Sequence, residues 1–215
     1  MGMVARWQYP VVLGDRILFK GSFSQGDELG ISDGTAAGTR LLKDIHPGSG
    51  GSHIAETVVL GDKVYFLADD GQGAGLWATD GTNAGTRLVK RGMKIIKDPV
   101  VARGRLFFAD STGFWVSDGT AAGTVHLTGS DLFERPVARG DKVFFHGRSA
   151  ATGDCLWVTD GTSAGTGPLF DPEPGWGGNE LLGLVATGSR HLFFAMKTEY
   201  RGRAGYVTDG TTAGT

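Results

Sequence analysis

The sequence lacks the features of several protein classes. It has one cysteine, Cys155, which excludes an internal disulfide and leaves no thiol pair at metal-ligand spacing. No apolar run approaches the roughly 20 residues of a membrane helix, and the first residues lack the basic-then-apolar order of a signal peptide. The formal net charge is −2 and no basic run occurs, whereas DNA-binding and RNA-binding surfaces cluster Lys and Arg. We therefore expect neither a membrane nor a nucleic acid as partner.

Helical periodicity is also absent over any useful length. What the sequence does contain is glycine, at 37 of 215 residues, so turns must be frequent. Hydrophobic residues make up 40% and charged residues 20%, which is typical of a globular protein with a buried core.

One short motif occurs five times. It reads SDGTAAGT at Ser32 and recurs with small changes, so that its DGTxxGT part occupies residues 33–39, 80–86, 118–124, 160–166 and 209–215. The aspartates are spaced by 47, 38, 42 and 49 residues, with a mean of 44. A four-stranded propeller blade has about 40–45 residues. The spacing therefore predicts five blades.

Each unit can be interpreted as four short strands, as in TVVLG, KVYFLA, GLWAT and RLVK of the second unit. The second strand carries a phenylalanine in every unit, at Phe19, Phe66, Phe108, Phe145 and Phe194. Three residues before each aspartate lie Gly30, Trp77, Trp115, Trp157 and Tyr206. Apolar residues occupy both faces of these strands, and a blade between two neighbouring blades is covered on both faces. We expect the three tryptophans in the core between blades.

The two ends of the chain predict how the ring closes. The fifth unit stops at Thr215, directly after its turn, so its fourth strand is missing there. The N-terminal segment Met3–Tyr9 precedes the first unit as a spare strand that can pair with the last blade. Closure removes two exposed strand edges. We predict an all-β fold, a closed five-bladed β-propeller of four-stranded antiparallel blades, with residues 1–215 as a single domain.

The repeated motif resembles that of the bacterial ELWxxDGTxxGT repeat proteins over nearly all of the chain. This sequence departs from the family pattern, because only Glu28 keeps the glutamate, and the tryptophan is replaced by Gly30 in the first unit and by Tyr206 in the fifth. The resemblance implies a propeller-like bacterial protein that is exported or lies on the cell surface. It implies no biochemical activity.

The two faces of the predicted ring differ. In a four-stranded meander the DGTxxGT turns lie on one face, the turn face, and they have the same length in every unit. The second-to-third loops and the blade connections lie on the other, the loop face, and their lengths vary. Asp, Gly and Thr can each build a turn, and five copies around a ring cannot converge on one catalytic point. We assign structural turn roles to Asp33, Asp80, Asp118, Asp160 and Asp209.

Ligand-binding candidates lie on the loop face. Trp176 is in the Pro- and Gly-rich stretch DPEPGWGGNE, where it is either a ligand platform or a loop anchor. Polar residues precede the innermost strands, where they form either a solvated rim or the acid and base of a glycosidase. The full set of ligand-binding candidates is Trp7, Gln8, Glu56, Asp98, Glu134, Trp176, Asn179, Glu180, Tyr200 and Arg201.

These patterns favour a binding module over an enzyme. We identify no catalytic residues, no cofactor and no metal site in the sequence, and the five histidines do not cluster. We expect a monomer that binds a carbohydrate, in the manner of a lectin, or a protein. Because the loops differ between units, we expect one or two unequal sites. The alternatives are a protein-interaction or structural scaffold and, less favoured, a glycosidase that uses carboxylates such as Glu134.

Overall fold

The computed structural model describes residues 8–93, 97–129, 136–149, 152–173, 179–187, 191–198 and 202–215. The chain forms two compact units, one of Met1–Ile96 with Asp118–Thr124 and one of Lys97–Ser117 with Val125–Thr215. All regular structure in the described residues is β-strand, which confirms the predicted all-β class. The described residues contain no helix that is long and apolar enough to cross a membrane.

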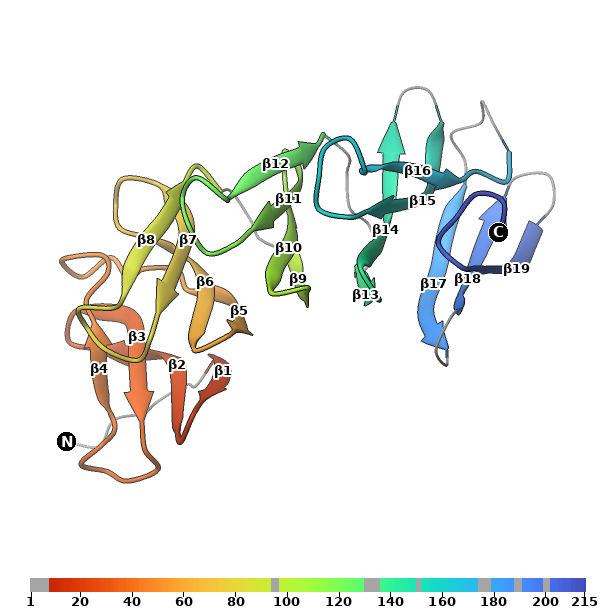
Figure 1. Cartoon of the computed structure of the whole chain (residues 1–215). Helices are drawn as coiled ribbons and strands as arrows, with labels where there is room; N and C mark the ends of the chain where they lie inside the picture. Colours follow the sequence, from red (N-terminus) through yellow and green to blue (C-terminus); the bar gives the residue numbers. More distant parts are fainter. Residues whose placement is uncertain are drawn as a thin grey trace. The chain divides into compact units, whose positions relative to one another are not determined.

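The described strands form five antiparallel sheets, and in each of them the strands neighbour one another in chain order (Figure 1). Sheet 1 contains β1 (Gln8–Leu13), β2 (Arg16–Phe23), β3 (Gly26–Ser32) and β4 (Arg40–Lys43). Sheet 2 contains β5 (Ala55–Leu60), β6 (Lys63–Asp69), β7 (Ala74–Thr79) and β8 (Arg87–Arg91).

The remaining sheets follow the same pattern. Sheet 3 contains β9 (Lys97–Ala102), β10 (Arg105–Asp110), β11 (Gly113–Ser117) and β12 (Val125–Thr128). Sheet 4 contains β13 (Val137–Arg139), β14 (Lys142–Ser149), β15 (Gly153–Thr159) and β16 (Gly167–Phe170). Sheet 5 contains β17 (Glu180–Thr187), β18 (His191–Thr198) and β19 (Gly202–Thr208).

A cross-strand pair recurs in the middle of every sheet. The phenylalanine of the second strand lies opposite the residue three before the aspartate, and all five phenylalanines are at most 1% exposed. The pairs are Phe19–Gly30, Phe66–Trp77, Phe108–Trp115, Phe145–Trp157 and Phe194–Tyr206. Cross-strand aromatic pairs are a main source of sheet stability, so the predicted repeat is also the repeat of the packing.

The glycine in the first pair has a steric reason. A Cβ atom built on Gly30 would lie 2.6 Å from Phe19 Cζ and 2.9 Å from Phe23 Cζ. The two phenylalanine rings, with centroids 6.5 Å apart, therefore occupy the space that an aromatic side chain fills in the other sheets. Sheet 1 keeps an aromatic pair by taking its second ring from the end of β2.

Two of the three tryptophans lie in cores between sheets, as predicted. Trp77 is 6% exposed and packs in one cluster with Leu18 and Ile31 of sheet 1. Trp157 is also 6% exposed and packs with Phe114 of sheet 3. Trp115 differs, because its indole is half-buried.

The Trp115 ring stacks on Phe108 with centroids 6.4 Å apart, and it meets His126 edge to face at 4.8 Å. Its Nε1 donates to Asp110 Oδ1 at 3.0 Å. The polar end of Trp115 therefore fixes the short β10–β11 loop and does not fill a core.

Each DGTxxGT turn is held by its own side chains. In residues 80–86, Asp80 Oδ1 accepts hydrogen bonds from Thr82 N (2.9 Å) and Thr82 Oγ1 (2.7 Å). Thr82 Oγ1 in turn accepts from Gly85 N (2.9 Å), and Thr86 Oγ1 donates to Thr82 O (2.6 Å). The same four bonds occur in the other four copies.

Both glycines of the motif are required by this geometry. Gly81 has a φ of +84°, a conformation that L side chains rarely adopt. A Cβ atom on Gly85 would lie 2.1 Å from Asp80 Oδ1, so only glycine leaves room for the carboxylate. The equivalent second glycines show clashes of 2.0–2.2 Å with their own aspartates.

The turns also contact the preceding sheet. The Arg105 guanidinium in β10 donates to Asp160 O (3.0 Å) and Gly161 O (3.2 Å) of the fourth turn. Lys142 Nζ in β14 donates to Gly210 O of the fifth turn at 2.7 Å. The second and third turns are tied in the same way by the pairs Asn83 Nδ2–Leu42 O and Lys90 Nζ–Thr124 O. The repeated turn therefore fastens one sheet to the next.

The predicted closing strand is only partly described. Gln8 and Tyr9, the last residues of the Met3–Tyr9 segment, belong to β1, where Gln8 pairs with Lys20 of β2. Residues 3–7 lie outside the described residues. Sheet 5 has three strands in the described part of the chain.

Candidate functional site

The loop ends of sheets 1 and 2, opposite their DGTxxGT turns, form the best-described polar surface. We call it the loop cluster: residues 44–54, which connect β4 to β5, and residues 69–73, which connect β6 to β7, with Asp27, Glu28 and Arg91. All of these residues lie in the first unit. The polar groups of the DGTxxGT turns bond to one another, whereas the loop cluster has polar groups that can meet a ligand.

Glu28 organises the first of these connections. Its carboxylate is fully buried and accepts hydrogen bonds from Ile45 N (2.9 Å) and His46 N (3.2 Å). Burial raises the pKa of Glu28, and the two backbone N–H groups oppose that shift. The glutamate of the repeated motif is thus a structural group that anchors the following connection.

Backbone bonds then join the two sheets through Ser52. Ser52 N donates to Asp27 O at 2.9 Å, and Asp69 N donates to Ser52 O at 2.8 Å. His46 lies between these segments, with Nδ1 3.0 Å from Gly51 O. The imidazole also packs on Gly71, where an added Cβ would lie 3.1 Å from Nε2. The cluster is therefore a fixed arrangement of connections, not a set of independent loops.

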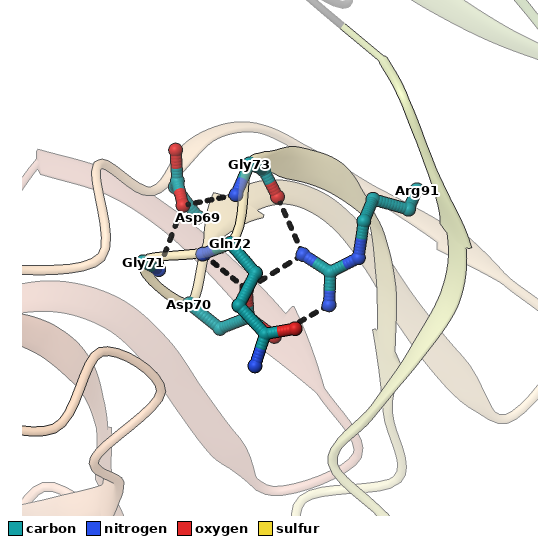
Figure 2. Close-up of polar contacts among 6 residues, drawn as sticks. All are labelled: Asp69, Asp70, Gly71, Gln72, Gly73 and Arg91. Carbon is teal, nitrogen blue, oxygen red and sulfur yellow. Dashed lines mark hydrogen bonds and ion pairs between the residues drawn. The ribbon is translucent and has the colours of Figure 1, made fainter.

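Residues 69–73 and Arg91 together present a carboxylate and a guanidinium, as Figure 2 shows. Asp69 Oδ1 accepts from Gly71 N (2.8 Å) and Gly73 N (3.1 Å), which closes the loop. Asp70 meets Arg91 through two bonds of 2.7 and 2.8 Å, and Arg91 also donates to Gly73 O at 2.9 Å. A bidentate pair of this kind fixes the orientation of both groups.

The electrostatics of the loop cluster favour recognition over proton transfer. Hydrogen bonds from Arg91 lower the pKa of Asp70 to about 2, so the carboxylate stays charged at neutral pH. A hydrogen bond from Ser22 is the largest of the contacts that lower the pKa of Asp27. The side chains of Asp70 and Arg91 are 18% and 35% exposed, so free lone pairs and N–H groups can still meet a ligand. Chemically, the pair can accept and donate hydrogen bonds to hydroxyl groups.

Four of the predicted ligand-binding residues have side chains in the described part of the chain. Glu56 in β5 and Asp98 in β9 are half-buried, Asn179 is 3% exposed, and Glu180 is exposed with an oxygen 3.9 Å from Lys197 Nζ. Glu56 is in the first unit and the other three are in the second. Gln8 lies in β1, and the predictions for Trp7, Glu134, Trp176, Tyr200 and Arg201 fall outside the described residues.

The first strands of sheets 1, 2 and 3 share a strained position. Tyr9, Glu56 and Asp98 have φ angles of +54°, +51° and +44°, and each lies at an irregularity in the pairing of its strand. At each irregularity two residues oppose one on the neighbouring strand, as in a β-bulge. Non-glycine residues with a positive φ of this kind cost about 1–3 kcal/mol and concentrate at functional sites. The strain is therefore consistent with Glu56 and Asp98 as ligand-binding candidates.

Sequence reasoning missed Asp70 and Arg91. The local signal was the stretch DDGQG, in which two acids flank glycines in a loop between predicted strands. Its partner Arg91 lies 21 residues later at the end of β8, and nothing in the sequence indicates that the two side chains meet.

Comparisons with known proteins identify the architecture. No protein-family model and no curated protein matches the sequence. Among solved structures, puromycin hydrolase is similar with 16% identity and a TM-score of 0.58, over 97% of this chain and 36% of that one. A prolyl endopeptidase is similar with 16% identity and a TM-score of 0.56, over 95% of this chain and 32% of that one.

The β-propeller domain of the Trilobed protease from Pyrococcus furiosus, which has an open velcro topology, is similar with 12% identity and a TM-score of 0.55. The match covers 98% of this chain and 70% of that one. This chain thus spans about a third of the length of the first structures that it matches. At these identities the likeness shows the fold alone, which is that of β-propeller proteins.

Proposed function

We propose that this chain is a non-enzymatic binding module that holds a carbohydrate at the loop ends of its sheets. One observation carries the proposal: Asp70 and Arg91 are fixed at the surface as a charged pair, while the polar groups of the DGTxxGT turns bond to one another. Carbohydrate sites need oriented acceptors and donors for hydroxyl groups, and a prearranged pair supplies both without an ordering cost. Glu56 of the same unit is a further candidate, and Asp98, Trp176 and Glu180 remain separate candidates from the sequence.

The experiment is a glycan microarray with the wild-type chain and two variants. Asp70→Asn removes the negative charge that pairs with Arg91 in the loop cluster. Asp62→Asn removes a more exposed negative charge at the β5–β6 turn, outside the loop cluster, where Asp62 forms a surface pair with Lys63 at 3.2 Å. We expect wild type and Asp62→Asn to bind the same glycans and Asp70→Asn to bind less. No binding by any variant would contradict the carbohydrate proposal.

The protein-interaction scaffold is the second candidate. Val207 in β19 is 47% exposed, whereas its counterparts Ile31, Ala78 and Val116 are at most 4% exposed and Val158 is half-buried. An apolar sheet face of this kind favours a covering protein surface. A pull-down from the source organism that recovers one partner, without any glycan binding, would favour the scaffold.

Closure of the ring is an alternative explanation of the exposed Val207, in which the chain itself covers this residue. In sheet 1 this position packs near the next turn, because Ile31 Cδ1 lies 3.7 Å from the Cβ position of Gly81. In the proposed closed five-bladed propeller, the N-terminal strand completes sheet 5 and the first turn covers Val207. Deletion of residues 1–7 should then lower the melting temperature, and an unchanged melting temperature would contradict closure.

Membership of the ELWxxDGTxxGT repeat family, with export to the bacterial surface, is part of the same proposal. It is supported by the five copies of the motif and by the anchoring role of Glu28. Fractionation of the source organism would test the location.

A further inference from the structure

The connection between β16 and β17 buries oxygen atoms that have no partner among the residues that the structure describes. Asp171 Oδ1 accepts hydrogen bonds from Glu173 N (3.0 Å) and Asn179 Nδ2 (3.1 Å), which holds the three residues together. The other oxygens, Asp171 Oδ2, both carboxylate oxygens of Glu173 and Asn179 Oδ1, are buried without a hydrogen bond. Glu173 is 8% exposed and Asn179 is 3% exposed.

The first connection of the chain has the same sequence pattern, and there only Asp44 Oδ1 is buried without a hydrogen bond. Residues 42–52 read LKDIHPGSGGS and residues 169–179 read LFDPEPGWGGN, so Asp44 corresponds to Asp171 and Ser52 to Asn179. In the first connection the carboxylate comes from Glu28 in β3, and both of its oxygens accept backbone N–H groups. That carboxylate therefore needs no ion.

Three replacements change this arrangement in the later connection. Cys155 takes the place of Glu28 opposite a glycine of the neighbouring strand, so the strand no longer supplies a carboxylate. Pro172 replaces Ile45 and has no N–H group to donate. Glu173 replaces His46 and brings a carboxylate into the connection itself, without the donors that Glu28 has.

A buried carboxylate without donors is costly unless a positive charge accompanies it. The two carboxylates carry a formal charge of −2, and with the Asn179 amide they offer four free oxygens. Ca²⁺ binds carboxylate and amide oxygens in flexible sets of six to eight ligands, which water completes. We propose that Asp171, Glu173 and Asn179 bind a calcium ion.

The sequence indicated Asn179 as a ligand-binding candidate but indicated no metal site. No group of three or more His, Cys, Asp and Glu side chains in the described residues could hold a metal. Here the third ligand is an amide oxygen, fixed by the bond from its own Nδ2 to Asp171. The all-oxygen set favours calcium over zinc, which prefers nitrogen and sulfur.

Thermal unfolding of the whole chain in EDTA, Ca²⁺ and Mg²⁺ tests the proposal. For a site with an affinity in the range of extracellular calcium modules, 5 mM Ca²⁺ should raise the melting temperature by about 3–8 °C. Glu173→Gln should abolish the rise. In EDTA the same variant should melt no lower than wild type, because it removes a buried charge. His46→Gln, at the corresponding position of the first connection, is the matched control and should keep the full response.

Two variants of Asn179 distinguish loss of calcium binding from a general folding defect. Asn179→Asp keeps an oxygen ligand and adds charge, so it should retain the calcium response, whereas Asn179→Leu should lose it. Absence of a Ca²⁺ response in wild type, or an equal response in Glu173→Gln, would overturn the proposal. A response to Mg²⁺ as large as that to Ca²⁺ would overturn the assignment to calcium.

Discussion

The fixed spacing of aspartate and glycine in the DGTxxGT turn can be tested with a double-mutant cycle. Asp80→Ala removes the acceptor of two hydrogen bonds, from Thr82 N and Thr82 Oγ1. The carboxylate acts like an N-cap, whose loss costs about 0.5–2 kcal/mol, and its exposure favours the lower half of that range. Gly85→Ala leaves the aspartate in place but adds a methyl group at 2.1 Å from its oxygen.

Because two atoms cannot approach so closely, the methyl group must expel the carboxylate and break the same two bonds. Each single variant should therefore lose roughly 1 kcal/mol, and Gly85→Ala slightly more because the turn is also strained. In the double variant the methyl group occupies vacated space, so its stability should equal that of Asp80→Ala. The coupling energy should be about 0.5–2 kcal/mol, or roughly 2–4 °C in melting temperature per kcal/mol.

Urea and thermal unfolding, followed by circular dichroism, measure all four forms. Gly167→Ala is the control, since a Cβ atom there meets nothing within 4 Å, and it should change stability by less than about 0.5 kcal/mol. Strictly additive effects of Asp80→Ala and Gly85→Ala, or a Gly85→Ala variant as stable as wild type, would refute the steric explanation of the motif.

Three further predictions follow from the structure. Gly30→Trp should destabilise the wild-type chain by about 1–3 kcal/mol in urea unfolding but less in a Phe23→Ala background, because Phe23 is one of the two rings, with Phe19, that occupy the space of the missing tryptophan. The pKa of Asp70 is lowered to about 2, so its pair with Arg91 should add stability above the unfolded-state pKa near 3.8, and this stability should be lost as the pH falls toward 2. In Asp70→Asn the free energy of unfolding, measured between pH 5 and 2, should therefore depend less on pH. Trp176→Ala should weaken glycan binding with an unchanged melting temperature if this residue is a platform, whereas a lowered melting temperature with unchanged binding would indicate a loop anchor. For the glycosidase alternative, the required result is cleavage of a glycoside by wild type that is lost in Glu134→Gln.

The repeat made most of the fold predictable. A motif that recurs five times at nearly constant spacing indicated the five sheets and their strand order, and the phenylalanine of each second strand indicated the buried cross-strand position. Trp115 departed from the pattern because Asp110, five residues earlier, captures its Nε1. That contact depends on a short loop whose conformation the repeat does not specify.

The candidate site was much less predictable. Asp70 and Arg91 meet only because β6 and β8 flank β7 in one sheet, and the sequence positions of the two residues give no sign of their contact. Glu28 was visible as a motif residue, but its role depends on the conformation of a connection that begins 16 residues later. Side chains that act across a loop require coordinates, whereas side chains that act within a strand follow from its period.

A crystal structure after soaking with the glycan that binds best on the array tests the central claim most directly. The claim is that the DGTxxGT turns are architecture and that ligands bind at the opposite ends of the sheets. The account predicts ligand density within hydrogen-bond distance of loop-end residues such as Asp70, Arg91 or Glu56. Ligand density at the DGTxxGT turns, with the loop ends empty, would contradict it.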